Sequence, residues 1–377
     1  MRTLFSILAC LTWSDHAWRV KISDPTAAFK PTDMFSHRVH KPTDMHPAVT
    51  KQVRMMADDA FEAGHGNVLV LDHFNINHEK GRHDLLKAFY FDLLGLAIDP
   101  RKVENLEKGK KTLWANAGAH QFHLPEAESA QVFDGTITMT FEDDEFKALL
   151  SRLESPPGVL EESKFAWKQT EAGVLVTDPW GSVFNLVHRD GPLEPRGAQP
   201  GPASQSTGLQ DLTVHVSSSV GSVAGIRRFY TQILGCAVNL ETDHKLVLQV
   251  GPEQTLTFLI QPEKDGIAHE DMVTLEEGIA NNGPHISMYV RDLKETFKRA
   301  HDLDVVFVNH RFSRRAYTLE DALDQCMFRI LDVVDPLDPG AGPIVRLEHE
   351  VRSTVKVDGS KYKSCPFFEV PTDVVRP

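Results

Sequence analysis

Two stretches of the chain carry hydrophobic residues at helical spacing and end at a glycine. Phe89–Gly95 reads Phe-Tyr-Phe-Asp-Leu-Leu-Gly, and Phe229–Gly235 reads Phe-Tyr-Thr-Gln-Ile-Leu-Gly. Both patterns predict an amphipathic helix that ends at a left-handed glycine cap. Alternating polar and apolar residues precede each helix, over Val70–His78 and Leu212–Ser217, and predict half-buried strands. Further strand patterns follow each helix, so each unit is expected to run strand, helix, then several strands.

A related pattern fills the second half of each block. Gly135–Phe141 alternates and leads into a helical pattern over Glu145–Leu153. His285–Val290 likewise leads into Leu293–Ala300, and strand patterns follow in both cases. The chain is therefore predicted to be an α+β protein of four βαβββ units arranged in two pairs.

Residues 190–208 separate the two blocks. This stretch contains four prolines and four glycines and almost no apolar side chains, so it favours neither a helix nor a central strand. We interpret it as a linker between a first domain at 66–189 and a second at 209–352. Residues 353–377 form a tail.

The first 57 residues differ in charge from the remainder. Residues 1–57 hold eight Lys or Arg, four Asp and no Glu, and Arg2 precedes an apolar run over Leu4–Trp13. This composition is typical of a targeting leader, and equally of a flexible head.

Composition narrows the classes of partner and compartment. The 40 Lys and Arg residues against 53 Asp and Glu give a net charge of −13, and no basic run is present, which argues against nucleic acid as a partner. No stretch approaches the 18 apolar residues that a membrane span needs. Four cysteines without a CxxC motif indicate neither a disulfide framework nor a zinc knuckle. We therefore expect a cytoplasmic or organellar protein.

Familiar catalytic motifs are missing. The sequence contains no phosphate-binding GxxxxGK[ST] loop, no GxGxxG after a strand and no GxSxG elbow. His78–His83 reads HExxxH, one residue too long to place both histidines on one face of a helix for zinc. It is therefore discounted as a metal motif.

The chain resembles the vicinal oxygen chelate superfamily. This superfamily includes glyoxalase I, bleomycin- and fosfomycin-resistance proteins, methylmalonyl-CoA epimerase and extradiol dioxygenases. The resemblance covers about residues 66–352. It is carried by the twin Phe-Tyr-x-x-x-Leu-Gly helices, by His285-Ile-Ser-Met-Tyr-Val-Arg-Asp292 and by Asp178-Pro-Trp-Gly181. It implies two tandem glyoxalase-like domains, in which paired units curl into a cup around one divalent metal ion such as Zn, Ni, Mn, Co or Fe.

The resemblance also implies a ligand set. In the family a histidine comes from the first strand of one unit, a second histidine from the first strand of its partner, and a glutamate from that partner's last strand. His285 matches the second histidine, and Glu348 is taken as the closing carboxylate on a strand face shared with Glu350. Thr136 and Asn185 occupy the equivalent positions of the first block and are poor ligands, so at most one metal site is expected.

The first histidine has two candidates. If each block closes its own cup, as in extradiol dioxygenases, the ligand is His215. If units exchange between the blocks, as in glyoxalase, the ligand is His73, beside a polar strand that places Gln121 and His123 on one face. Some family members use a Glu or Gln on that strand, which makes Gln121 a further candidate ligand. The polar strand favours His73 slightly.

The resemblance implies two kinds of function. The first is a divalent-metal-dependent lyase, isomerase or ring-cleaving dioxygenase that acts on a small molecule with two neighbouring oxygens, with Glu348 as the catalytic carboxylate. The second is a metal-free small-molecule binding protein of the bleomycin-resistance type, whose walls would include Trp114, Trp167 and Trp180. In both cases the partner is a small molecule, and the protein is a monomer or a homodimer.

Overall fold

The computed structural model describes residues 66–109, 112–191, 203–218, 222–262 and 284–376. The predicted leader or head at 1–57 lies outside the described residues, and so does most of the predicted linker at 190–208. All of the described residues fall within one unit, 48–377.

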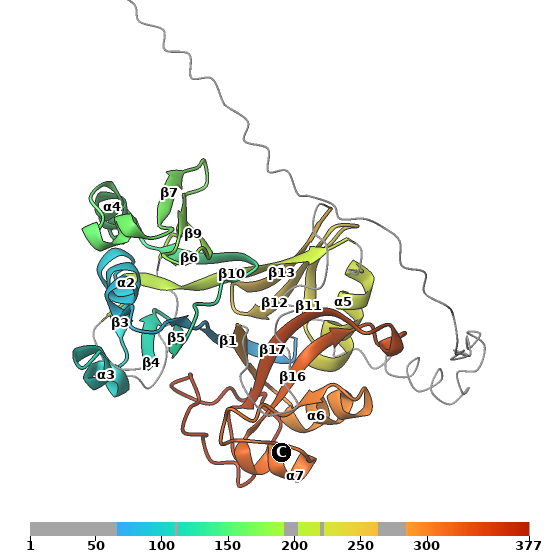
Figure 1. Ribbon diagram of the computed structural model, residues 1–377. Helices are drawn as coiled ribbons and strands as arrows, with labels where there is room; N and C mark the ends of the chain where they lie inside the picture. The colour runs from blue at the N-terminus through green and yellow to red at the C-terminus, as the bar shows by residue number, and fades with distance from the viewer. Residues whose placement is uncertain (1–65, 110–111, 192–202, 219–221, 263–283, 377) are drawn as a thin grey trace, which may run out of the picture. The chain divides into compact units, whose positions relative to one another are not determined.

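Nine strands form the first sheet, which we call the cup sheet (Figure 1). Eight of them run in the order β15 (Val306–Phe307), β16 (Met327–Val334), β17 (Pro343–Ser353), β14 (His285–Val290), β1 (Val68–Asn75), β5 (His120–Ala127), β4 (Thr112–Ala117) and β3 (Ala97–Ile98). The ninth, β2 (His78–Glu79), pairs with β5 off this path.

Eight strands form the second sheet. Their order is β11 (Ala237–Glu241), β12 (Lys245–Gly251), β13 (Gln254–Gln261), β10 (Ser206–Ser217), β6 (Gly135–Phe141), β9 (Val183–His188), β8 (Val174–Thr177) and β7 (Ala166–Gln169). The alternating patterns of the sequence correspond to β1, β6, β10 and β14, the first strand of each unit.

Helices lie at all four predicted positions, and two further short helices, at Val103–Glu107 and Leu319–Gln325, were not predicted from the sequence. The α-helices are α2 (His83–Leu86), α3 (Val103–Glu107), α4 (Asp143–Glu154), α5 (Val223–Phe229), α6 (Leu293–Asp302) and α7 (Leu319–Gln325). Short 3₁₀ turns occupy Pro100–Lys102, Gly158–Glu162 and Pro339–Ala341. The two repeated helices widen into π-helical turns, over Lys87–Leu93 after α2 and over Tyr230–Leu234 after α5. Each is followed by a left-handed glycine, Gly95 at φ 66° and Gly235 at φ 68°, as the sequence predicts.

The pairing of units crosses between the two blocks of the sequence. β1 of the first unit pairs antiparallel with β14 of the fourth, and β6 of the second unit pairs antiparallel with β10 of the third. The predicted α+β fold of four βαβββ units in two pairs is confirmed. Neither 66–189 nor 209–352 closes a sheet alone, so the exchanged arrangement is the one observed.

Aromatic residues of the repeated helices form the centre of the core. Phe89 and Tyr90 pack edge-on against Phe184 of β9, and Tyr230 packs against Phe258 of β13. All five side chains are buried. The Phe-Tyr pair therefore serves the same purpose in both blocks: it fastens a helix to a sheet.

One buried glutamine connects the two sheets. The side-chain amide of Gln254 donates to the carbonyl oxygens of Leu71 in β1 and Leu209 in β10, at 3.0 and 3.2 Å. Its oxygen accepts from the Leu71 N–H at 3.0 Å. Gln254 thus pairs main-chain groups that would otherwise be buried without a partner.

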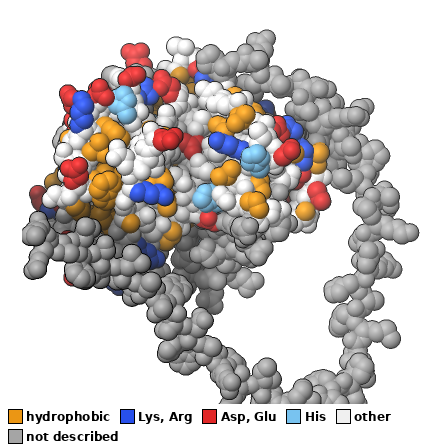
Figure 2. Space-filling model, turned by 90° about the horizontal axis from the view of Figure 1, so that it is seen from above, with side chains coloured by type: hydrophobic (Ala, Val, Ile, Leu, Met, Phe, Trp, Pro, Cys, Tyr) orange, Lys and Arg blue, Asp and Glu red, His pale blue; other side chains and the backbone are white. Residues whose placement is uncertain are grey.

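The surface mixes charged and apolar residues. Figure 2 shows acidic and basic side chains interleaved with hydrophobic ones on the face in view. Within the described ranges, no helix is both long enough and apolar enough to cross a membrane.

Candidate metal centre

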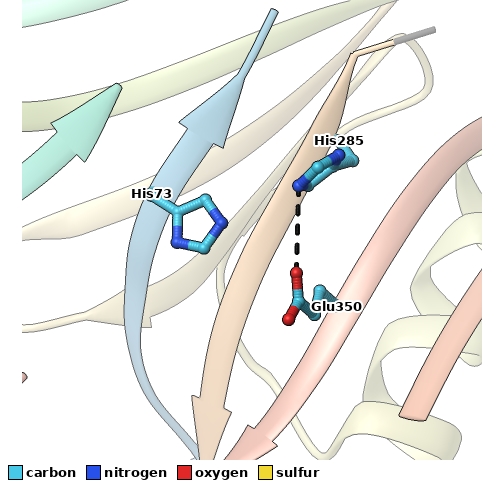
Figure 3. Close-up of side chains that lie close together, drawn as sticks. All are labelled: His73, His285 and Glu350. Carbon is cyan, nitrogen blue, oxygen red and sulfur yellow. Dashed lines mark ion pairs between the residues drawn. The ribbon is translucent and has the colours of Figure 1, made fainter. Parts of the chain in front are cut away.

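Two histidines and a glutamate converge on one face of the cup sheet. His73, His285 and Glu350 come from the neighbouring strands β1, β14 and β17, and all three are buried (Figure 3). One potential ligand atom from each lies within 4.8 Å of the other two. The strand register explains this convergence, because His73 stands opposite Ser287 in β14 and Ser287 stands opposite Glu350. His285 precedes Ser287 by two residues and so shares its face.

Asp72 fixes the tautomer of His73. The His73 Nδ1–H donates to the Asp72 carboxylate at 2.9 Å. An ionised carboxylate can only accept, so Nδ1 carries the proton and Nε2 keeps its lone pair. The Nε2 atom is buried and has no hydrogen-bond partner in the described part of the chain. A carboxylate behind the imidazole is the usual support of a metal-binding histidine.

Both imidazoles are held in the neutral form. Burial lowers the pKa of His73 below its ordinary value, although the hydrogen bond to Asp72 opposes the shift. Burial also lowers the pKa of His285 strongly, and the nearby Arg329 guanidinium adds to this effect. Neutral imidazole is the form that binds metal ions.

Glu350 is ionised and paired with two arginines. Arg352 donates to its Oε1 at 2.7 and 2.5 Å, and Arg329 donates to its Oε2 at 2.9 Å. Burial alone would raise the pKa of the Glu350 carboxyl, but these guanidinium groups outweigh that effect and hold it well below its usual value. The same Oε2 lies 3.9 Å from His285 Nε2.

Glu348, the carboxylate expected from sequence, does not join this group. It accepts hydrogen bonds from Arg329 and, at 2.9 Å, from the side-chain amide of Asn309. Burial raises the pKa of Glu348, against the opposing charge of Arg329. Glu348 and Glu350 share a strand face, and the pairing of β17 with β14 brings Glu350 level with His73. The closing carboxylate of the group is therefore Glu350, and sequence periodicity alone could not distinguish the two.

His215 stands apart from this group. It lies on β10 of the second sheet, where its Nδ1 is 3.7 Å from an Asp134 carboxylate oxygen. Thr136 and Asn185, the poor ligands of the first block, lie on β6 and β9 of the same second sheet. Of the two candidates for the first ligand, the structure brings His73 to His285.

Gln121 lies beside His73 in the parallel register of β1 and β5. Its amide nitrogen donates to Asp99 at 2.8 Å and to Asn116 at 2.5 Å, and its oxygen accepts from His123 Nε2 at 2.8 Å. His123 stacks on His73, with ring centroids 3.8 Å apart. In this arrangement Gln121 orients His123, and His123 supports the face of His73.

The three side chains open into a cavity of about 400 Å³. Of the three tryptophans expected as walls, Trp114 lines this cavity and stacks on His123 at 4.5 Å. Trp167 is exposed on β7, and Trp180 contacts His78 outside the cavity lining. The lining contains two carboxylates, Asp72 and Glu350, and five arginines, Arg101, Arg311, Arg314, Arg329 and Arg352. Two of these arginines, Arg101 and Arg329, also pair with Asp99 and Glu348 outside the lining.

Comparisons with known proteins find similar structures and no matching sequence. No family model and no curated protein sequence matches the chain. Among solved structures, a Bacillus subtilis protein described as a dioxygenase matches 77% of this chain and 86% of its own, at 12% identity and a TM-score of 0.47. Glyoxalase I from Zea mays matches 75% of this chain and 92% of its own, at 13% identity and a TM-score of 0.46. The 2,3-dioxygenase LapB from Pseudomonas sp. KL28 matches 79% and 94%, at 14% identity and a TM-score of 0.26.

These proteins are members of the superfamily that the sequence resembles. The likeness concerns the fold, and the residues of the site stand on this chain's own geometry. What the structure itself shows is a fold of four units with crossed pairing.

Proposed function

We propose that the chain is a divalent-metal-dependent enzyme whose ion is held by His73, His285 and Glu350. The observation that carries this proposal is the convergence of two buried, neutral imidazoles on one ionised carboxylate, with Asp72 directing the His73 lone pair. The donor set fits the ion. Imidazole and carboxylate together suit Zn²⁺, Fe²⁺ and similar ions, and three protein ligands leave coordination positions for a substrate.

The bound ion would act as a Lewis acid toward a substrate oxygen. Residues around the ligands would hold them in the form and orientation that bind the ion. Asp72 keeps His73 in one tautomer, and Arg329 and Arg352 keep Glu350 ionised and oriented. Phe312 packs edge-on against His285, with ring centroids 5.8 Å apart, and Arg329 lies over its ring.

The substrate that suits this cavity is an anion. Five arginines line the cavity, and they face four carboxylates once Asp99 and Glu348, which pair with Arg101 and Arg329 from outside the lining, are counted with Asp72 and Glu350. One positive charge remains in excess, and a metal dication would add to it. A site of this sign concentrates small anions, above all carboxylates that guanidinium groups can grip with two hydrogen bonds. We therefore propose a small carboxylate or similar anion that also offers two neighbouring oxygens.

Of the reaction types that the fold admits, oxygenation is favoured. Two histidines and one carboxylate are the ligand set of non-haem iron(II) oxygenases. Glu350 is a weak base because its pKa is held low, which disfavours it as the group that removes a proton in a lyase or isomerase. Glu348 does not line the cavity, so the catalytic role expected for it from sequence does not form part of the proposal.

A metal-free binding protein is the second candidate. The observation that favours it is the pairing of Glu350 with two guanidinium groups, which already balances its charge without an ion. In that case the same cavity would hold an anion against the arginines.

Metal content of single variants separates the two candidates. The full chain is loaded under anaerobic conditions with Fe²⁺ or Zn²⁺, desalted and assayed by elemental analysis. We expect His73→Ala and His285→Ala each to lose one equivalent relative to the unsubstituted chain. The control His215→Ala, in the second sheet, retains the full content.

An unchanged metal content in both His73→Ala and His285→Ala would overturn the metal-dependent proposal. Binding of a small dicarboxylate by the metal-free chain, weakened in Arg311→Ala, would then support the binding protein.

A further inference from the structure

A second group of side chains that could hold a metal ion lies outside the cup. His78 of β2, His83 at the start of α2 and Glu126 of β5 each place a potential ligand atom within 4.8 Å of the other two. The imidazole rings of His78 and His83 face each other with centroids 5.0 Å apart and planes tilted by 33°.

The four ring nitrogens of these histidines have no hydrogen-bond partner among the described residues. His78 is only 1% exposed, and His83 is partly buried. A buried polar group without a partner costs free energy, and native proteins rarely leave one unexplained. Two such histidines side by side, next to a carboxylate, call for a shared ligand.

A turn brings these histidines together. The HExxxH spacing is too long for one helical face, but only His83 is helical, because the intervening residues form a turn that includes Gly81. The turn is fastened to β5: the Lys80 N–H donates to the Ala127 carbonyl at 2.8 Å, and the Gly81 N–H donates to Glu126 Oε1 at 2.9 Å. The helical rule by which the motif was discounted therefore does not apply here.

This group is separate from the cup, although both use β5. Gln121, His123 and Pro125 line the cup cavity and alternate along the strand. Glu126 follows Pro125 and therefore faces the opposite side of the strand. Neither His78 nor His83 lines the cup cavity.

Both histidines carry lone pairs at neutral pH. Burial lowers the pKa of His78 to about 4, and a proton on His83 would lower it further, whereas the Glu126 carboxylate and then the main-chain groups of Pro125 and Leu124 oppose the shift. Burial also lowers the pKa of His83. Neutral imidazoles next to a carboxylate form a ready site for a borderline cation.

We propose that His78, His83 and Glu126 form a second metal site, which takes Zn²⁺ and fastens the start of α2 to strand β5. Two imidazoles and one carboxylate are ordinary zinc ligands, and the partly exposed side leaves a position for water. The ion would pair the buried nitrogens and tie down the turn that precedes the Phe89-Tyr90 helix.

The test uses the full chain with His285→Ala, so that zinc bound in the cup does not obscure the second site. The protein is stripped with a chelator and titrated with Zn²⁺ alone against a chromophoric indicator. We expect the His285→Ala chain to bind one equivalent, and adding His83→Ala to weaken this binding by about 100-fold or more, since even residues behind a ligand are worth 10- to 100-fold. Zinc should raise the unfolding temperature of the first protein and not of the second.

The variant Glu126→Gln distinguishes the loss of a zinc ligand from a folding defect. Its amide oxygen can still accept from the Gly81 N–H, so the turn survives while the charged ligand is lost. His244→Ala, at an exposed histidine, is the matched control and should bind zinc as before. The proposal is overturned if the His285→Ala chain binds no zinc, if His83→Ala and Glu126→Gln leave its affinity unchanged, or if His244→Ala weakens it equally. The proposal for the cup is tested separately, by the loss of bound metal in His73→Ala.

Discussion

At the scale of single residues, Glu350 joins two arginines of the cup through its carboxylate. It is buried, and it accepts hydrogen bonds from two arginines that are themselves buried or nearly so. A buried ion pair contributes little net stability when complete, but the loss of one partner leaves a charge buried without compensation.

Glu350→Gln is therefore expected to lower the free energy of unfolding by about 3–5 kcal/mol, because Arg329 and Arg352 lose their shared counter-charge. Urea denaturation at neutral pH measures the effect. Asp332→Asn is the control, since the Asp332–Arg346 pair is partly exposed and its loss should cost about 1 kcal/mol or less. Equal losses in the two variants would contradict the electrostatic account of Glu350.

Tyr230 illustrates a buried hydrogen bond of the core. Its hydroxyl lies 2.7 Å from His349 Nε2, and both side chains are fully buried. Tyr230→Phe keeps the ring contact with Phe258 and leaves the imidazole nitrogen without its partner. We expect a loss of about 1–3 kcal/mol in unfolding free energy, measured by urea denaturation. A neutral or stabilising effect would show that the hydrogen bond contributes nothing net.

At the scale of elements, α5 is attached to the end of β16 by an ion pair. Arg228 donates to the two carboxylate oxygens of Asp335 at 2.8 and 2.5 Å. The hydrogen bonds from Arg228 hold the pKa of Asp335 below its ordinary value, although partial burial opposes them. α5 belongs to the third unit and β16 to the fourth, so the pair joins two units.

Because the folded pKa is depressed, the stability from this pair is complete above the unfolded pKa of about 3.9 and is lost as the pH falls through the lower, folded value. Asp335→Asn should cost about 1 kcal/mol at pH 7, a modest figure because the pair is partly solvated. The unfolding free energies of both chains, measured from pH 7 down to pH 2, should differ by a constant amount above about pH 3.9 and approach each other below it. A difference that stays constant over the whole range would contradict the assignment.

The elements themselves could be predicted from sequence, and their register could not. Hydrophobic periodicity located the Phe89 and Phe229 helices and the first strand of every unit, since burial on one face imposes that periodicity. Glu348 and Glu350 lie two residues apart on one strand, so both fit the pattern equally. Only the pairing of β17 with β14 and the position of Arg329 separate their roles. His78 and His83 were discounted for a related reason: the turn at Gly81 has no periodic signal.

At the scale of the whole molecule, the two sheets meet at a tight turn. Gly118 joins β4 to β5 in the cup sheet with φ 57°, and a Cβ there would lie 2.0 Å from the Thr207 carbonyl oxygen of β10. The adjacent Ala119 N–H donates to that same oxygen at 3.0 Å. Only glycine allows the second sheet to approach this closely.

Gly118→Ala should therefore destabilise the fold by more than about 3 kcal/mol, as left-handed strain and a main-chain clash combine. Gly191→Ala is the matched control, because Gly191 has a similar φ of 72° but open space around its Cα. Its cost should be about 1–2 kcal/mol, from backbone strain alone. Thermal or urea unfolding compares the two, and similar costs would argue against close approach of the sheets.

The crossed pairing also makes the two halves of the sequence interdependent. Expressed alone, 66–191 keeps β5 beside β1 and β9 beside β6 but lacks their other partners, β14 and β10. The half 203–376 likewise lacks β1 beside β14 and β6 beside β10. We expect neither half to unfold cooperatively as a monomer, and co-expression to yield a one-to-one complex. A half that gives a sharp monomeric transition, followed by circular dichroism, would contradict the pairing.

The pairing of β1 with β14 also bears on the order of folding. Asn75 and His285 are partners roughly 210 positions apart in the chain, whereas Gly135 and Val214 of the other pair are about 80 apart. A longer loop costs more entropy to close, and contacts between distant residues form slowly. The β6–β10 pair can form as soon as β10 has been synthesised. β1 can pair early with β5, but its pairing with β14 requires the last unit. The cup, which brings together His73 and His285, is thus expected to be the last part of the chain to assemble and the rate-limiting step of refolding.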